Sequence, residues 1–192
     1  MKAQDTLAVE NLSQYQLVNL ETKASYSLES RAKEFVTHFE QVTPLSLLAD
    51  NPLDTAIDVM RSAHVGAALV ASEEGEFLGI VSLTDLQSVK VLSIANKKGL
   101  KRDELSVQDV MVDKSALLGL SEVTLAHTSI GEVLHTLEKL GSQHILVVNP
   151  QNREIKGLIS ARDIAKKLHI PVHIVPTATS FEEVMLAVQQ SH

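Results

Sequence analysis

Two stretches of the sequence share one pattern: glycine, two apolar residues, serine, two further residues and aspartate. They are residues 79–85 and 157–163. Each stretch leads from an apolar segment typical of a buried strand into the start of a helix. The first backbone N–H groups of a helix can bind an anion, a serine hydroxyl can donate to a phosphate or a ribose, and a carboxylate can accept hydrogen bonds from ribose hydroxyls. The pattern therefore indicates a nucleotide site, with Ser82 and Asp85 in one copy and Ser160 and Asp163 in the other. The same residues could instead only cap their helices.

Other recognisable chemistry is missing from the sequence. It contains no GxxxxGK[ST] phosphate loop, no GxGxxG, no GxSxG and no cysteine. His169 and His173 are four residues apart, but Pro171 between them would break a helix. On a strand they would be about 13 Å apart, too far to share a zinc ion. We therefore expect no metal site, and a small enzyme is the weakest of the possible functions.

Composition limits the class of protein further. The chain has 192 residues, 44% of them hydrophobic, and a net charge of −7. A general nucleic-acid binder would be basic. The apolar stretch at residues 65–71 is far shorter than the roughly 18 residues of a membrane span, and the polar start of the chain has no signal-peptide core. The sequence predicts an acidic, soluble, cytoplasmic protein that binds neither nucleic acid nor membrane.

An internal repeat organises the chain. Residues 48–53 align with residues 125–130 at an offset of 77. Asn51 with Pro52, and Ser129 with Glu132, can each start a helix. The same offset relates two apolar stripes, each on one face of a helix: Leu53, Ala56, Ile57 and Met60, then Ile130, Val133, Leu134 and Leu137.

The elements after these helices also correspond. Residues 65–71 and 145–148 predict buried strands, and a polar turn leads from each to the shared motif and a second helix. Three segments lie outside the repeats: residues 1–44, a polar linker at 93–120, and a C-terminal helix from Ser180. The first contains a stripe that predicts another helix, namely Leu28, Ala32, Phe35, Val36 and Phe39. The sequence thus predicts an α+β fold.

The two copies resemble a tandem pair of cystathionine-β-synthase-type (CBS) domains, called a Bateman module. The resemblance covers residues 41–172 and is based on Thr55, Ala56, Met60 and residues 65–70, 79–86, 107–111, 144–149 and 157–164. It implies two β-α-β-β-α repeats packed about a pseudo-twofold axis. The expected parts are an N-terminal helical extension (1–40), a first repeat (41–100), a second repeat (101–172) and a C-terminal helix (173–192).

The resemblance also implies a ligand. CBS pairs often bind AMP, ADP, ATP or S-adenosylmethionine as regulatory ligands in the clefts between repeats, with the motif aspartate on the ribose. Here these are Asp85 and Asp163, with Ser82 and Ser160 as hydroxyl donors. The residues expected to line the base pockets are Asp50, Val65 and Gly66 in the first copy and His127, Gln143 and Ile145 in the second.

The two expected clefts differ in charge. Arg162 precedes Asp163, where the first copy has Thr84, and His144 occupies the position of Ala67. Because arginine can bind a phosphate through two hydrogen bonds, we expect the second cleft to prefer a phosphorylated adenosine.

These features predict a stand-alone regulatory module, not an enzyme, that senses an adenine nucleotide. It would signal through a homodimer or an unknown protein partner, with helices at 28–42 and 180–190 as candidate surfaces. The alternative is a CBS scaffold with empty clefts that acts only in protein interaction.

Overall fold

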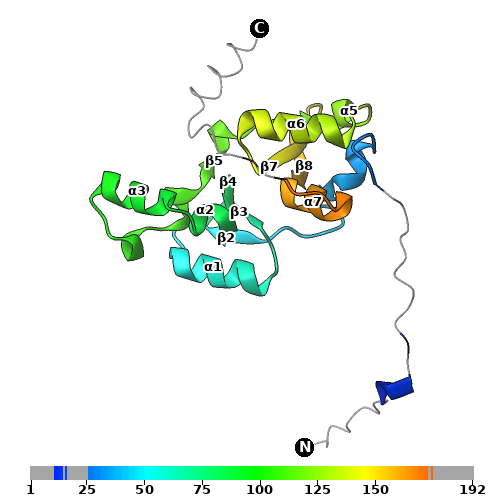
Figure 1. Ribbon diagram of the computed structural model, residues 1–192. Coiled ribbons are helices and arrows are strands. Elements are labelled where there is room, and N and C mark those ends of the chain that lie inside the picture. The colour runs from blue at the N-terminus through cyan, green and yellow to red at the C-terminus, as the bar shows by residue number, and fades with distance from the viewer. Residues whose placement is uncertain (1–10, 15, 17–25, 173, 175–192) are drawn as a thin grey trace, which may run out of the picture.

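The computed structural model describes residues 11–14, 16, 26–172 and 174, and folds them around two four-stranded sheets. The first repeat comprises β2 (Ser46–Leu48), α1 (Leu53–Ser62), β3 (Ala67–Ala71), β4 (Phe77–Ser82), α2 (Leu83–Leu86) and α3 (Lys90–Lys98). The second comprises β6 (Gly119–Ser121), α5 (Glu122–Leu125), α6 (Ile130–Leu140), β7 (His144–Asn149), β8 (Glu154–Ser160) and α7 (Ala161–Leu168). In Figure 1, α1 and α6 lie on opposite outer sides of the sheets.

Short elements connect and precede the repeats. They are η1 (Leu12–Gln14), η2 (Ala32–Phe35), β1 (Thr37–His38), η3 (Arg102–Glu104), α4 (Val107–Val110), β5 (Val112–Asp113) and η4 (Lys114–Ala116). The strand orders are β2-β3-β4-β5 in one sheet and β1-β8-β7-β6 in the other. The expected α+β repeat is confirmed, because each copy runs through a parallel strand, a helix and an antiparallel pair.

The predicted helix stripes form the two cores. Leu53, Ala56, Ile57 and Met60 of α1 are buried, as are Ile130, Val133, Leu134 and Leu137 of α6. Leu53 and Ile130 are each the first residue of their helix, as the repeat predicts. The α6 helix starts with the expected capping box: the backbone N–H of Ser129 donates to Glu132 at 2.7 Å, and the Ser129 hydroxyl accepts from the backbone N–H of Glu132.

The repeats exchange edge strands. β1 precedes the first repeat but pairs with β8 of the second, and β5 precedes the second repeat but pairs with β4 of the first. The residues before these strands follow the same exchange: Phe35 is buried in the core of the second repeat, and Val110 in that of the first. The sheet and core of each repeat are therefore completed by the segment that precedes the other repeat in the chain. A pseudo-twofold arrangement of the repeats produces this reciprocal exchange.

The motif glycines lie where the exchanged strands come closest. Gly79 pairs with Asp113 and Gly157 with His38. A Cβ atom on residue 79 would lie 2.2 Å from the carbonyl oxygen of Val112, and one on residue 157 would lie 2.6 Å from that of Thr37. Only glycine fits such a close approach of two backbones, so the repeated glycine secures the strand exchange.

The prediction of a helix at residues 28–42 is wrong. This segment contains one turn of 3₁₀ helix, η2, and then turns extended at Val36 to enter β1. Its Ala32 and Phe35 are fully or almost fully buried against the second repeat. Pairing with the edge of β8 outweighs the local helical pattern, and these apolar residues are not a free dimer surface. The helix expected at 180–190 lies outside the described residues, as does His173.

Two details of the predicted repeat are corrected as well. Leu48 pairs with Ala71 and Ser121 with Val148, so the counterpart of Leu48 is Ser121 and not Leu125. The difference is the extra helical turn α5, which the first repeat lacks. Asn51 does not cap α1, because its side chain accepts a 3.1 Å hydrogen bond from the backbone N–H of Leu48 and closes the turn after β2.

Candidate functional site

In the first motif the serine and the aspartate bind each other. Ser82 ends β4 and caps α2: its hydroxyl accepts from the backbone N–H of Asp85 at 3.0 Å and donates to the Asp85 carboxylate at 2.6 Å. The other carboxylate oxygen of Asp85 lies 4.0 Å from Nζ of Lys90. The capping interpretation therefore holds for this serine, and one oxygen of Asp85 is left for a ligand.

The second motif has the same backbone but not the same side-chain bonds. Ser160 ends β8 in an extended conformation and is buried, yet its hydroxyl makes no cap hydrogen bond. Within the described part of the chain, Asp163 makes no hydrogen bond or ion pair. Both polar groups that could hold a ribose are thus available in the second copy.

Residues expected to line the base pockets lie beside the motifs. The backbone N–H of Leu83, directly after Ser82, donates to the carbonyl of Gly66, and that of Ala161, directly after Ser160, donates to the carbonyl of Gln143, both at 2.9 Å. Ile145 is buried one position into β7, while Val65 is half-buried just before β3. The structure thus places Gly66 and Gln143 at the start of the helix that follows each motif.

Arg162 extends from the second repeat to the first. Its Nη1 atom would lie 3.5 Å from a Cβ on Gly66, so its guanidinium group lies over the entry to β3. Thr84, its exposed counterpart on α2, has no charge to offer. Arg162, which was predicted for the second cleft, therefore lies at the boundary between the repeats. It is next to Gly66, which was predicted for the first cleft.

His144 lies between the two motifs. It pairs with Ser160 across β7 and β8. Its side chain keeps some solvent contact but is closely surrounded by the two repeats, and this burial lowers the pKa of His144 from 6.5 to about 4. The nearby carboxylates of Asp85 and Asp163 act in the opposite direction and only partly offset the burial. His144 is therefore neutral at pH 7.

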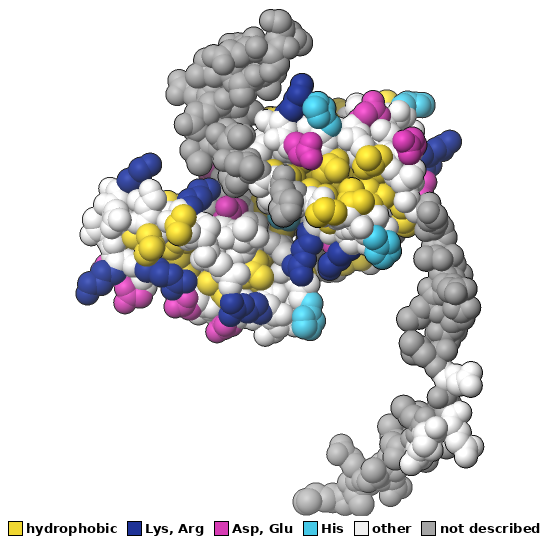
Figure 2. All heavy atoms as spheres, viewed as in Figure 1, with side chains coloured by type: hydrophobic (Ala, Val, Ile, Leu, Met, Phe, Trp, Pro, Cys, Tyr) yellow, Lys and Arg dark blue, Asp and Glu magenta, His cyan; other side chains and the backbone are white. Residues whose placement is uncertain are grey.

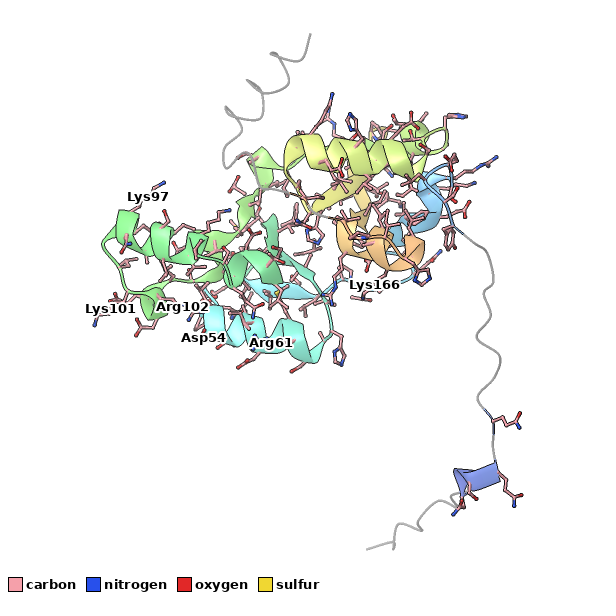
Figure 3. The ribbon with its side chains drawn as sticks, in the orientation of Figure 1. Asp54, Arg61, Lys97, Lys101, Arg102 and Lys166 are labelled. Atoms are coloured by element: carbon pink, nitrogen blue, oxygen red, sulfur yellow. The ribbon has the colours of Figure 1, made fainter. Side chains whose placement is uncertain are left out.

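Two predicted residues lie apart from this cluster. Asp50 is exposed in the turn after β2. His127 lines an open cavity of about 430 Å³ together with Arg31 and Ser129, and none of the motif residues belongs to it. A second open cavity of about 460 Å³ lies over α1, where the side chains of Asp54 and Arg102 form an ion pair (Figure 3). Neither cavity contains Ser160 or Asp163.

Two contacts in this region were not predicted from the sequence. Lys90 approaches Asp85 from α3, one helix further along, and Gln143 donates through Nε2 to the carbonyl of Ile174 at 3.3 Å. The five-residue spacing between Asp85 and Lys90 could have suggested the first contact. No local pattern signals the second, because it joins residues 31 positions apart.

Comparison with known proteins agrees with this architecture. The CBS domain family matches residues 34–91 and 107–170. An uncharacterised conserved protein from Pyrococcus horikoshii is 19% identical with a TM-score of 0.54, covering 77% of this chain and 98% of its own. A CBS-domain protein from Agrobacterium tumefaciens is 17% identical with a TM-score of 0.52, covering 74% and 97%. A conserved CBS domain protein from Thermoplasma acidophilum is 16% identical with a TM-score of 0.50, covering 80% and 77%.

These structural likenesses concern the fold. Among the described residues, no helix has the length and apolar character to cross a membrane. The family match takes in both motifs, the second repeat and the first repeat up to the start of α3, together with the exchanged strands β1 and β5. The chain therefore belongs to the CBS domain family and contains two CBS repeats in tandem.

Proposed function

We propose that this chain is a regulatory module that binds an adenine nucleotide at the second motif, between the two repeats. The observation that carries this proposal is the difference between the motifs: Ser82 and Asp85 bind each other, while Ser160 and Asp163 have no such bond. A buried hydroxyl at the N-cap of α7 and a carboxylate in its first turn, both with unused hydrogen-bonding capacity, match the hydroxyls of a ribose.

The phosphate of this ligand would be bound by Arg162. Arginine offers a planar, permanently charged group that suits phosphate, and this one lies against Gly66 of the first repeat. A nucleotide with its ribose on Asp163 and its phosphate on Arg162 would contact both repeats at once. AMP, ADP and ATP fit this arrangement better than S-adenosylmethionine, whose sulfonium would lie close to a like charge.

Signalling would follow from that double contact. A ligand shifts a conformational equilibrium only by its difference in affinity between the states. Ligand bound across the repeat boundary favours one relative placement of the repeats, and a homodimer or a partner protein would read that placement. Nothing in this scheme requires a reaction, so the role is regulatory and not catalytic.

Titration calorimetry with AMP, ADP, ATP and S-adenosylmethionine tests the proposal. Asp163→Asn should weaken nucleotide binding by at least tenfold, because hydrogen bonds to a charged group are worth about 1.5–3 kcal/mol each. Asp85→Asn is the matched control and should have a smaller effect. Arg162→Ala should weaken ATP more than adenosine.

Two results would count against the proposal. Equal losses from Asp85→Asn and Asp163→Asn would overturn the asymmetry between the motifs. Absence of heat with every adenosine compound would favour the alternative, a CBS scaffold without ligand. At the first motif, the hydrogen bond between Ser82 and Asp85 is consistent with a scaffold that binds no ligand there.

A further inference from the structure

The open cavity of about 430 Å³ lies where the chain before the first repeat contacts the second repeat. Its volume is in the range of small-molecule sites. Residues 28–32 run antiparallel to residues 128–131 there, and the backbone N–H of Ala32 donates to the carbonyl of Thr128 at 2.9 Å. The cavity is therefore built on a hydrogen-bonded backbone, beside the helical turn α5 that the first repeat lacks.

Three charged side chains from two parts of the chain line this cavity: Glu29, Arg31 and Glu132. One oxygen of each carboxylate is already bound. Glu29 Oε2 accepts from the Ser27 hydroxyl at 2.7 Å, and Glu132 Oε2 accepts from the backbone N–H of Ser129 at 2.7 Å. These hydrogen bonds lower the pKa of both carboxyl groups, so both are ionised at pH 7.

These charges do not neutralise one another. Within the described part of the chain, Arg31 forms no ion pair, and the second oxygen of each carboxylate makes no hydrogen bond. In the cavity over α1, by contrast, Arg102 already pairs with Asp54 at 2.7 Å. Figure 2 shows acidic, basic and histidine side chains gathered at the α5 end of the second repeat. The cavity thus offers one cation and two anions with unused bonding capacity.

We propose that this cavity binds a free basic α-amino acid of the lysine type. Its carboxylate would bind Arg31 through two hydrogen bonds, and its two ammonium groups would pair with Glu29 and Glu132. A ligand with two cations and one carboxylate is the charge complement of these three side chains. The cavity contains no motif residue, so this ligand would be a second input that does not depend on the nucleotide.

The lining disfavours other ligands. A phosphate group would bring its negative charge close to two carboxylates. Ala126 is the one apolar residue among the described residues that line the cavity, so an apolar ligand would bury little surface. The described residues contain no group of three His, Asp or Glu side chains placed to hold a metal ion. A simple cation would leave Arg31 without a partner.

Nuclear magnetic resonance titration of the full, nucleotide-free chain with L-lysine tests the proposal. Backbone amide signals of residues 29–31 and 126–132 should shift saturably. Three analogues each lack one charge: Nα-acetyl-L-lysine, L-lysinamide and L-norleucine. Each should bind about fivefold more weakly than lysine, the size of effect expected for one exposed ion pair.

Variants assign each charge of the ligand to its partner. With Arg31→Gln, lysine and lysinamide should bind equally, because the partner of the carboxylate is gone. With Glu29→Gln and Glu132→Gln together, lysine and norleucine should bind equally. Glutamine at position 132 keeps the capping box of α6, so this variant removes charge without removing the helix start.

The matched control is Glu73→Gln with Arg153→Gln. It changes one exposed acidic and one exposed basic residue outside the cavity and should bind lysine like the wild type. Circular dichroism checks that each variant is folded. Asp163→Asn should also leave lysine binding unchanged, so this proposal and the proposed nucleotide site can fail independently.

Four outcomes would overturn the proposal. The first is the absence of any saturable shift with lysine, and the second is a set of shifts spread over the surface away from this cavity. The third is binding of lysinamide or norleucine to the wild type as tightly as lysine. The fourth is unchanged lysine binding by both the Arg31 variant and the paired glutamate variant.

Discussion

The Ser82 hydroxyl donates to the Asp85 carboxylate at 2.6 Å while accepting from the backbone N–H of the same residue. Ser160 makes neither bond with Asp163. Two copies of one motif thus differ in whether the serine supports its helix. We expect Ser82→Ala to lower the free energy of unfolding by about 1 kcal/mol, the typical loss for a capping serine.

The matched change is Ser160→Ala, which removes no cap and should lower the free energy of unfolding by much less. Urea denaturation of both variants measures the difference. Equal destabilisation would mean that Ser160 supports its helix as well, and would remove the argument that it is available for a ligand.

A second prediction concerns the motif glycines. Gly79→Ala and Gly157→Ala should each destabilise the protein by about 1–3 kcal/mol, the range for overpacked sites, because the new methyl group would meet the backbone of an exchanged strand. Gly66→Ala is the control, since its nearest neighbour would be the flexible Arg162 side chain at 3.5 Å. Thermal unfolding compares the three. If Gly66→Ala is as harmful as the other two, close backbone approach is not the reason.

The third prediction is a pH dependence of stability that originates at His144. Burial lowers its pKa in the folded protein from 6.5 to about 4. Below pH 6.5 the unfolded chain therefore takes up a proton that the folded protein does not, so stability falls as the pH is lowered from 6.5 to 4 and is unaffected above 6.5. The loss attributable to this residue is about 3 kcal/mol.

His144→Gln isolates this contribution, because it replaces the titrating ring with a neutral side chain. The free energy of unfolding of the variant should change less with pH between 6.5 and 4 than that of the wild type, while the two curves run parallel above pH 7. Parallel curves over the whole range would show that His144 titrates normally. Asp85 and Asp163 are the carboxylates that raise the pKa of His144, so their asparagine variants should lower it further and extend the loss of stability from this residue to lower pH.

The fourth prediction tests the strand exchange through Phe35. This residue is 3% exposed in the core of the second repeat, with its ring 5.0 Å from that of Tyr26. Phe35→Ala should cost about 3–5 kcal/mol, whereas the half-buried Phe39 should tolerate alanine better. Amide hydrogen exchange should show loss of protection first in β7 and β8, although the mutation precedes β2 in the chain. Earlier loss in β3 and β4 would contradict the exchange.

The sequence predicts what is periodic and local. The stripes led by Leu53 and Ile130, and the capping box at Ser129 and Glu132, follow from spacing alone, and all are found in the structure. The serine and aspartate of each motif are also adjacent in sequence, so their proximity was predictable. Their unequal hydrogen bonding was not, because it depends on side-chain conformations that the two identical patterns do not determine.

What the sequence did not predict is non-local. The spacing of Ala32 and Phe35 is typical of an α-helix, but the residues that follow form β1 and pair with the edge strand β8. Tertiary pairing overrides local preference there. In the same way, the position of Arg162 against Gly66 depends on how the repeats meet, and the offset between Leu48 and Ser121 depends on a helical turn inserted in one copy only.

The exchanged strands also set an order of events during synthesis of the chain. β5 can complete the sheet of the first repeat as soon as residue 113 has left the ribosome. β1 cannot pair until its partner strand β8 has been synthesised through Leu158. At about 5–20 residues per second, some 120 residues of translation separate Thr37 from Leu158, a delay of roughly 6–24 s. Throughout this interval Phe35 has no core to enter, so the nascent N-terminal segment is the part of this protein that a chaperone would meet first.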